Sequence, residues 1–193
     1  NKNKEILAYI YSEIGLIYKK QKEFNKALLY LDTALVYSKE INYKRGIATI
    51  SSYKANIEKS LRNFKKAKEL YQNSLNAYRI INYGPGVSQA LTSLAEIEIE
   101  HKNYLRAVEM LDSAWIGAKN NNLLEEQAEI LRLKLEANRA IGETEKALYY
   151  YDEYSKMKDS LFNIDREKQI EEIETKFQTV KKEKQIEILN QET

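Results

Sequence analysis

Residues 23–28 read EFNKAL, and related stretches return at 40-residue intervals as NFKKAK at 63–68, NYLRAV at 103–108 and ETEKAL at 143–148. Each stretch holds an alanine at the same place, so four alanines stand 40 residues apart: Ala27, Ala67, Ala107 and Ala147. A fixed period of this size is typical of a repeat array, in which stacked units bury a continuous core that no single unit could bury alone. The period therefore predicts the fold class, and it favours a protein that acts by offering a surface.

Other positions of the 40-residue unit predict a pair of antiparallel helices. Twelve residues before the alanine, three of the four units carry a small residue, which lets two helices approach closely: Gly15, Ala55 and Ala95, followed by Leu135 in the last unit. Four residues after it stand large residues on the face expected to be buried: Leu31, Tyr71, Leu111 and Tyr151. We expect helices near 4–21, 24–41, 45–61, 64–81, 86–101, 104–120, 124–141 and 144–160, with asparagine-containing turns between units.

This pattern resembles the tetratricopeptide repeat (TPR). The first unit carries the family's order of large and small residues at Tyr11, Ile14, Gly15, Tyr18, Ala27, Leu31 and Ala34. The resemblance implies an all-α, TPR-like right-handed α-solenoid of four helix pairs over residues 1–160, with units at about 4–43, 44–83, 84–123 and 124–160. Polar or oversized residues depart from the pattern, and in the last unit they suggest a terminal unit with a more polar face: Lys54, Glu58, Lys134, Leu135 and Asn138.

Residues 161–193 form a charged segment of different composition, for which we expect one long C-terminal helix. Ile170, Ile173, Phe177 and Val180 follow the 3-4-3 spacing of a coiled-coil seam; Lys184 takes the next seam position, and Ile188 and Leu189 resume the stripe loosely. The stripe favours a homodimeric coiled coil. The alternative is a single helix that packs the stripe on the array or lies partly free.

The stretch 154–191 resembles the linker of TPR-containing sensor histidine kinases of Gram-negative bacteria and of related membrane-anchored regulators with helix-turn-helix outputs. In those families the linker helix leaves the array, runs as a coiled coil and enters a membrane helix, with the output domain beyond. The resemblance implies that this chain is the periplasmic input fragment of an inner-membrane receptor, and both of its ends read as cuts through a longer protein. Any membrane attachment or kinase activity would then belong to segments that are not in this chain.

Composition bears on the other function classes. The formal net charge is +2, from 31 basic and 29 acidic residues, which gives no electrostatic case for nucleic acid. There is no cysteine and no phosphate-cradling glycine-rich loop, and the one histidine, His101, is expected at a solvated turn. We therefore expect no enzyme activity, no metal and no cofactor in this chain.

In arrays of this type the first helix of each unit lines a concave groove, where a protein or peptide would bind. The helical register places these candidate residues there: Tyr9, Ser12, Ser52, Tyr53, Asn56, Thr92, Glu96, Arg132, Glu136 and Arg139. Asn56 stands where peptide-binding members of the family often bond a ligand backbone, and the two arginines would attract acidic groups. The opposing interpretation is a solvated, unused groove.

Two readings of function remain open. The first is the sensory domain of a two-component-type membrane receptor, whose coiled coil relays a signal. The second is a cytosolic TPR adaptor or peptide-responsive regulator. A hydrophobic span encoded soon after Thr193 would separate them.

Overall fold

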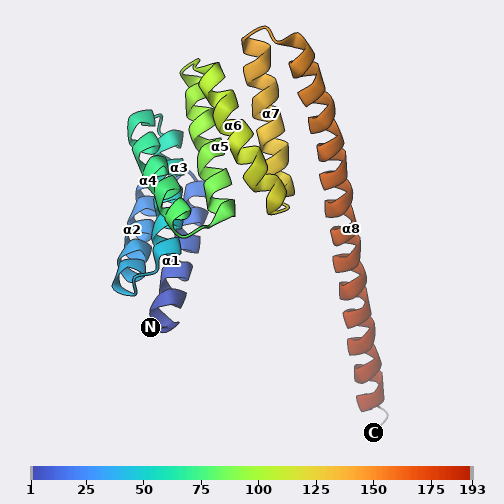
Figure 1. The fold of residues 1–193 in the computed structure, drawn as a ribbon. Coiled ribbons are helices and arrows are strands. Elements are labelled where there is room, and N and C mark those ends of the chain that lie inside the picture. The colour runs from blue at the N-terminus through green and yellow to red at the C-terminus, as the bar shows by residue number, and fades with distance from the viewer. Residues whose placement is uncertain (1, 192–193) are drawn as a thin grey trace.

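The computed structural model describes the backbone of residues 2–191 and the side chains of residues 2–184. Within residues 2–191 the chain forms eight α-helices and no strand, arranged as four hairpins side by side (Figure 1). The helices are α1 (Lys2–Lys20), α2 (Phe24–Glu40), α3 (Lys44–Ser60), α4 (Phe64–Ile80), α5 (Gly84–Glu100), α6 (Tyr104–Asn120), α7 (Leu124–Ala140) and α8 (Thr144–Gln191). The all-α helical solenoid predicted from the 40-residue period is confirmed.

The turns between helices share one geometry. Each three-residue link holds a residue of positive φ, and these residues are spaced by 20: Lys22, Asn42, Arg62, Asn82, Lys102, Asn122 and Gly142. After α1, for example, the Glu23 amide bonds to the Tyr18 carbonyl at 2.9 Å and the Lys22 amide to the Lys19 carbonyl at 3.0 Å, which closes the helix end. Asparagine tolerates this left-handed conformation, so its recurrence between units marks the turns.

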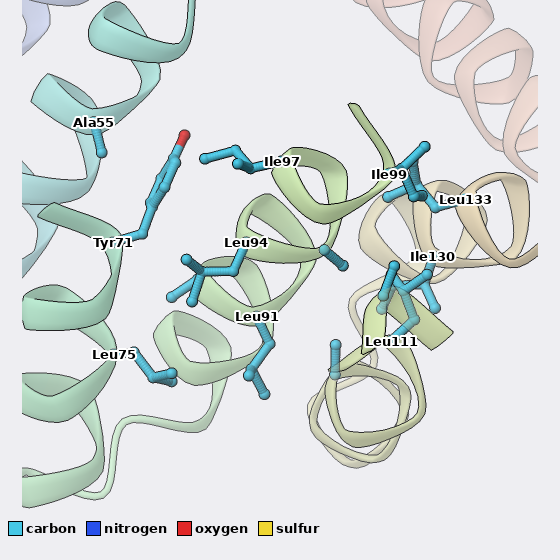
Figure 2. Close-up of a cluster of buried hydrophobic side chains, with 14 of the residues drawn as sticks. Ala55, Tyr71, Leu75, Leu91, Leu94, Ile97, Ile99, Leu111, Ile130 and Leu133 are labelled. Atoms are coloured by element: carbon cyan, nitrogen blue, oxygen red, sulfur yellow. The ribbon is translucent and has the colours of Figure 1, made fainter. Parts of the chain in front are cut away.

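Helices α1, α3, α5 and α7 form an inner layer, in which each contacts the next, and α2, α4 and α6 pack on its outer side. All four repeat alanines are buried at the crossings. In the central core, Leu94 and Ile97 of α5 lie toward Tyr71 of α4, while Leu111, Ile130 and Leu133 gather on the other side of α5 (Figure 2). One core thus runs through the second, third and fourth units.

Helix α8 differs from the sequence expectation in length. We expected the array's last helix to end near residue 160, but α8 continues unbroken through 48 residues, since its sequence offers no glycine or proline to stop it. At 1.5 Å per residue it is roughly 70 Å long, and it projects beyond α7 as a single rod (Figure 1). A domain division at 160/161 stays a prediction, and Ile188 and Leu189 lie outside the described side chains.

The last unit differs from the sequence expectation in two further ways. Tyr151 is 59% exposed, although its counterparts Leu31, Tyr71 and Leu111 are buried. Its burial was predicted wrongly because, in the earlier units, the next unit covers this position. Conversely, Lys134 and Asn138 are buried, not part of a polar outer face. Helix α8 covers them, and Lys134 Nζ pairs with Asp112 at 2.5 Å.

The free face of α1 is apolar. Ile6, Ile10 and Ile17 are 44–54% exposed, whereas Ile50 and Ile57, which occupy the same unit positions as Ile10 and Ile17 one repeat later, are buried. The preceding unit covers those positions in α3. For the residues described here, none of the helices is both long enough and apolar enough for a membrane crossing.

Candidate binding clefts on the inner helices

Three hollows lie along the inner layer. The charged cleft, about 460 Å³, is lined by Lys59, Arg62, Glu96, Glu100, Arg132 and Glu136 near the C-terminal ends of α3, α5 and α7. The tyrosine trough, about 720 Å³, lies at the opposite ends of α1 and α3 and is lined by Tyr9, Tyr43, Arg45, Tyr53 and Tyr83. The tail cleft, about 560 Å³, lies between α8 and the N-terminal ends of α5 and α7, and its lining includes Tyr53, Tyr83, Glu126, Leu161, Ile164 and Asp165.

The ionic groups of the charged cleft are largely paired with one another. Lys59 of α3 pairs with Glu96 of α5. Arg132 donates to Glu129 at 2.9 and 2.6 Å and to Glu136 at 3.3 Å. The bonds to Glu129 raise the pKa of Arg132, and the same bonds lower the pKa of Glu129 although burial opposes this. A charged ligand would have to displace these internal pairs.

Lys19 continues the charged row toward the first unit. Burial lowers its pKa, and the nearby Lys59 ammonium lowers it further, while Glu96 acts in the opposite direction. The side chains of Lys59 and Glu96 are each only about a quarter to a third exposed. Because partly buried charges are screened less than surface ones, the Lys59–Glu96 pair links α3 to α5, whereas the nearby ammonium groups of Lys19 and Lys59 repel each other.

The predicted groove residues do not lie in a single cleft. Glu96, Arg132 and Glu136 line the charged cleft, whereas Tyr9, Ser12 and Tyr53 line the tyrosine trough. Ser12, Ser52 and Thr92 occupy equivalent positions 40 residues apart and are buried; the Ser12 and Thr92 hydroxyls donate to carbonyls one helical turn earlier. Arg139 is exposed at the end of α7. Their role in binding stays a prediction.

Asn56 already has an internal partner. Its Oδ1 accepts a hydrogen bond of 2.7 Å from the hydroxyl of Tyr71. Burial raises the pKa of Tyr71, so this hydroxyl remains protonated and able to donate. The Asn56 Nδ2 group is the part of the side chain that could still serve a ligand.

The tyrosine trough is an aromatic surface with one guanidinium between its rings. Arg45 lies over the rings of Tyr43 and Tyr83, with 5.7 and 5.4 Å to the ring centroids, and its Nε donates to the Tyr43 hydroxyl at 3.0 Å. Burial raises the pKa of Tyr53. Gly46 lies so close to this surface that a Cβ at residue 46 would stand 2.3 Å from the Tyr43 ring, and this close approach requires glycine. Surfaces of this kind suit apolar and aromatic side chains of a ligand.

Sequence reasoning did not place Tyr43, Tyr83, Glu126 or α8 in a binding cleft. The sequence did contain a signal for Tyr43 and Tyr83, because these tyrosines follow the turn asparagines at a spacing of 40 residues. We read those positions only as turns. The part played by Leu161, Ile164 and Asp165 could not be inferred, since it depends on α8 continuing beyond the array.

Among residues 2–184, no three histidine, cysteine, aspartate or glutamate side chains are grouped to hold a metal ion. The His101 ring lies at the turn after α5, where its Nδ1 is 2.7 Å from the Ile97 carbonyl and its ring packs against that of Phe64 in a T-shaped arrangement. These contacts explain the residue structurally.

Comparison with known proteins places the fold. No protein-family model matches the sequence, and no curated protein matches it at a significant level. Among solved structures, BtubC (BKLC) from P. vanneervenii is similar with a TM-score of 0.70 and 22% identity over 82% of this chain and 65% of that one. Aspartyl phosphate phosphatase F from Bacillus subtilis has a TM-score of 0.76 and 15% identity over 81% and 41%.

A Rap protein complexed with Competence and Sporulation Factor has a TM-score of 0.55 and 18% identity over 80% of this chain and 53% of that one. A kinesin light chain with TPR-like repeats from Podosopora anserina is also similar, with a TM-score of 0.60 and 12% identity over 79% and 75%. These likenesses establish a TPR-like helical fold. The chain spans less than two thirds of BtubC, of the phosphatase and of the Rap protein.

Proposed function

We propose that this chain is the input part of a two-component-type receptor, in which the array binds a protein or peptide and α8 passes the bound state to a second copy. The observation that supports it best is the continuity of α8. Its first turns pack on α7, and the same helix then carries Ile170, Ile173, Phe177 and Val180, which are 46–66% exposed. A narrow apolar stripe on a charged rod gains most by pairing with another copy of itself.

Disulfide cross-linking tests the pairing. The chain has no cysteine, so single cysteine variants report on one position each. Ile173→Cys should form a disulfide-linked dimer on mild oxidation, because a seam residue faces its counterpart in a parallel pair. Thr175→Cys, on the opposite side of α8, is the matched control and should remain monomeric. Equal cross-linking of the two variants, or no cross-linking of Ile173→Cys, would contradict the proposed pairing of α8 with a second copy.

The place of the array in the cell is also part of this proposal. We place it on the periplasmic side of an inner membrane, attached through a segment outside residues 1–193, and the support is the resemblance of 154–191 to sensor-kinase linkers. A topology reporter fused to the array in the full-length gene product tests it. Activity of a reporter that works only in the cytoplasm would favour the alternative below.

The alternative is an adaptor or peptide-responsive regulator that works without a membrane segment. The tyrosine trough favours it, since an aromatic hollow of about 720 Å³ could accept a peptide by itself. The likeness to a Rap protein solved with a bound factor supports a binding role of this kind. In this case α8 would stay monomeric in the cross-linking experiment while peptides still bind.

A further inference from the structure

The tail cleft has a charge character that the other two hollows lack. All of the charged side chains described in its lining are acidic: Glu125, Glu126 and Asp165. The rest of its lining consists of the tyrosines Tyr53, Tyr78 and Tyr83, of apolar residues that include Leu161 of α8, and of three uncharged polar residues, Thr49, Gln89 and Asn122. The charged cleft and the tyrosine trough each contain both signs of charge. The tail cleft is therefore an aromatic hollow with a negative potential.

Glu126 occupies a place that the second and third units give to glycine. The equivalent residues are Gly46 and Gly86, and a Cβ at Gly86 would stand 2.6 Å from the ring of Tyr78. One unit later the position of Tyr78 is taken by Ala118, which is buried and small. The missing ring leaves room for a longer side chain at residue 126.

The Glu126 carboxylate lacks a complete set of partners. Its Oε1 is buried and has no hydrogen-bond partner among the described residues. Burial raises the pKa of Glu126, the carboxylates of Glu129 and Glu96 raise it further, and Thr92 acts in the opposite direction. An unpaired buried carboxylate oxygen costs free energy, and the Glu126 side chain is also part of the lining of the tail cleft.

We propose that the tail cleft binds the basic side chain of a peptide, an arginine or lysine, between the rings of Tyr53 and Tyr83 and the carboxylates of Glu126 and Asp165. Tyrosine faces attract cations, and charge-assisted bonds to carboxylates are among the strongest hydrogen bonds in proteins. Arg45 already stacks on Tyr83 from the neighbouring trough. This inference rests on the proposed function and specifies the chemistry of its ligand.

The position of this cleft adds a consequence for signalling. Leu161, Ile164 and Asp165 belong to α8, and Asp165 precedes the first seam residue, Ile170, by little more than one helical turn. A bound basic group would thus touch both the array and the helix that carries the seam. Ligand binding would reach the rod by direct contact.

Peptide titration of the whole ¹⁵N-labelled chain tests the proposal. The probes are two blocked tripeptides, leucine-arginine-leucine and leucine-glutamate-leucine, followed by NMR chemical shifts. The arginine tripeptide should shift amides within 83–86, 123–126 and 161–165. Glu126→Gln combined with Asp165→Asn should weaken its binding by roughly tenfold or more, which corresponds to about 1.4 kcal/mol. Asp159→Asn, on α8 but outside the cleft lining, should bind like the parent.

Three results would overturn the proposal: equal binding of the glutamate tripeptide, unchanged affinity in the double variant, or no shifts with the arginine tripeptide at millimolar concentration. Shifts confined to the charged cleft would overturn it as well, because the ligand site would then be the charged cleft, although the array would still bind a peptide. Because cross-linking at Ile173→Cys needs no ligand, it reports on the receptor proposal independently of the cleft.

Discussion

At the residue scale, the array contains glutamates of two opposite kinds. Glu98 is 1% exposed, yet its carboxylate accepts bonds from Lys68 at 2.5 Å and Asn103 at 2.8 Å. Burial alone would raise its pKa, but these bonds outweigh burial and lower the pKa. Glu58 accepts the equivalent bond from Asn63 one unit earlier and pairs with Lys66 of its own unit, whereas the Lys68 that pairs with Glu98 comes from the preceding unit. The asparagine follows the first helix and precedes the second, so the glutamate joins the two helices of a unit.

Glu98 and Glu126 should therefore respond oppositely to replacement by glutamine. The folded pKa of Glu98 is lowered, so its ionised form stabilises the fold above the unfolded pKa near about 4.3, and this is lost as pH falls through the folded value. We expect Glu98→Gln to lower stability at neutral pH by about 1–3 kcal/mol, the usual range for hydrogen bonds to a charged group. The loss should shrink in acid, as measured by urea unfolding against pH.

For Glu126 the sign reverses. Its folded pKa is raised, so ionisation destabilises the fold above that pKa, and the penalty is absent below the unfolded value. Glu126→Gln should thus melt above the parent at neutral pH and converge with it near about pH 4. A gain in stability together with a loss of arginine binding is typical of a residue kept for function. Parallel pH profiles for the two variants would contradict both assignments.

At the scale of the helices, one sequence position can be core or surface according to its neighbours. Ile17 and Ile57 are the same residue at the same place in successive units, but Ile17 is 54% exposed and Ile57 is 0% exposed. The difference arises because the preceding unit covers α3, while the described residues place no helix on that side of α1. Burial in a solenoid is therefore a property of pairs of units.

Alanine substitutions at these two positions should separate the effect of the neighbour from that of the residue. Ile57→Ala should cost about 2–5 kcal/mol, because it leaves a cavity between packed units. Ile17→Ala should cost about 1 kcal/mol or less, since much of its surface is already in water. Chemical denaturation of the two variants and the parent measures both. Similar losses would indicate that Ile17 is covered in solution.

The helical array was largely predictable because its signals repeat. Alanines at a 40-residue spacing fix the crossings, and asparagines that tolerate positive φ fix the turns, so the observed helix boundaries of α2 to α7 differ from expectation by no more than two residues. The ends were less predictable. Tyr151 occupies a position that is buried in the other units, but no further unit of the described chain covers it. Lys134 is a residue type usually found at the surface, but it is buried beneath α8. Neither fact is encoded within the unit itself.

The clefts were predictable only in part. The helical register alone predicted that Glu96, Arg132 and Tyr53 lie on the inner surface, but it could not show that Arg132 is already bound to Glu129. Nor could it show that Glu126 lies where a missing ring leaves space. Such features depend on the size of a side chain in the preceding unit, which a pattern of large and small residues describes too coarsely.

At the scale of the whole molecule, the array and the rod share one helix. The tail cleft lies where α8 passes the ends of α5 and α7, and the seam begins shortly after it. A ligand in the cleft can influence pairing only to the extent that it binds the paired and unpaired states with different affinity. Because alternative packings of a helical seam are discrete, a small displacement of α8 at Asp165 could favour one of them.

This coupling predicts a reciprocal effect. The leucine-arginine-leucine tripeptide should change the rate at which Ile173→Cys forms its disulfide, and the cross-linked dimer should bind the tripeptide with an affinity changed by the same factor as the pairing equilibrium. Adding Glu126→Gln and Asp165→Asn should abolish both effects while leaving basal cross-linking intact, because neither residue belongs to the seam. Titrations of the oxidised and reduced protein measure the factor. Identical affinities in the two states would show that the cleft and the seam are independent, and the rod would then be a static support for the array.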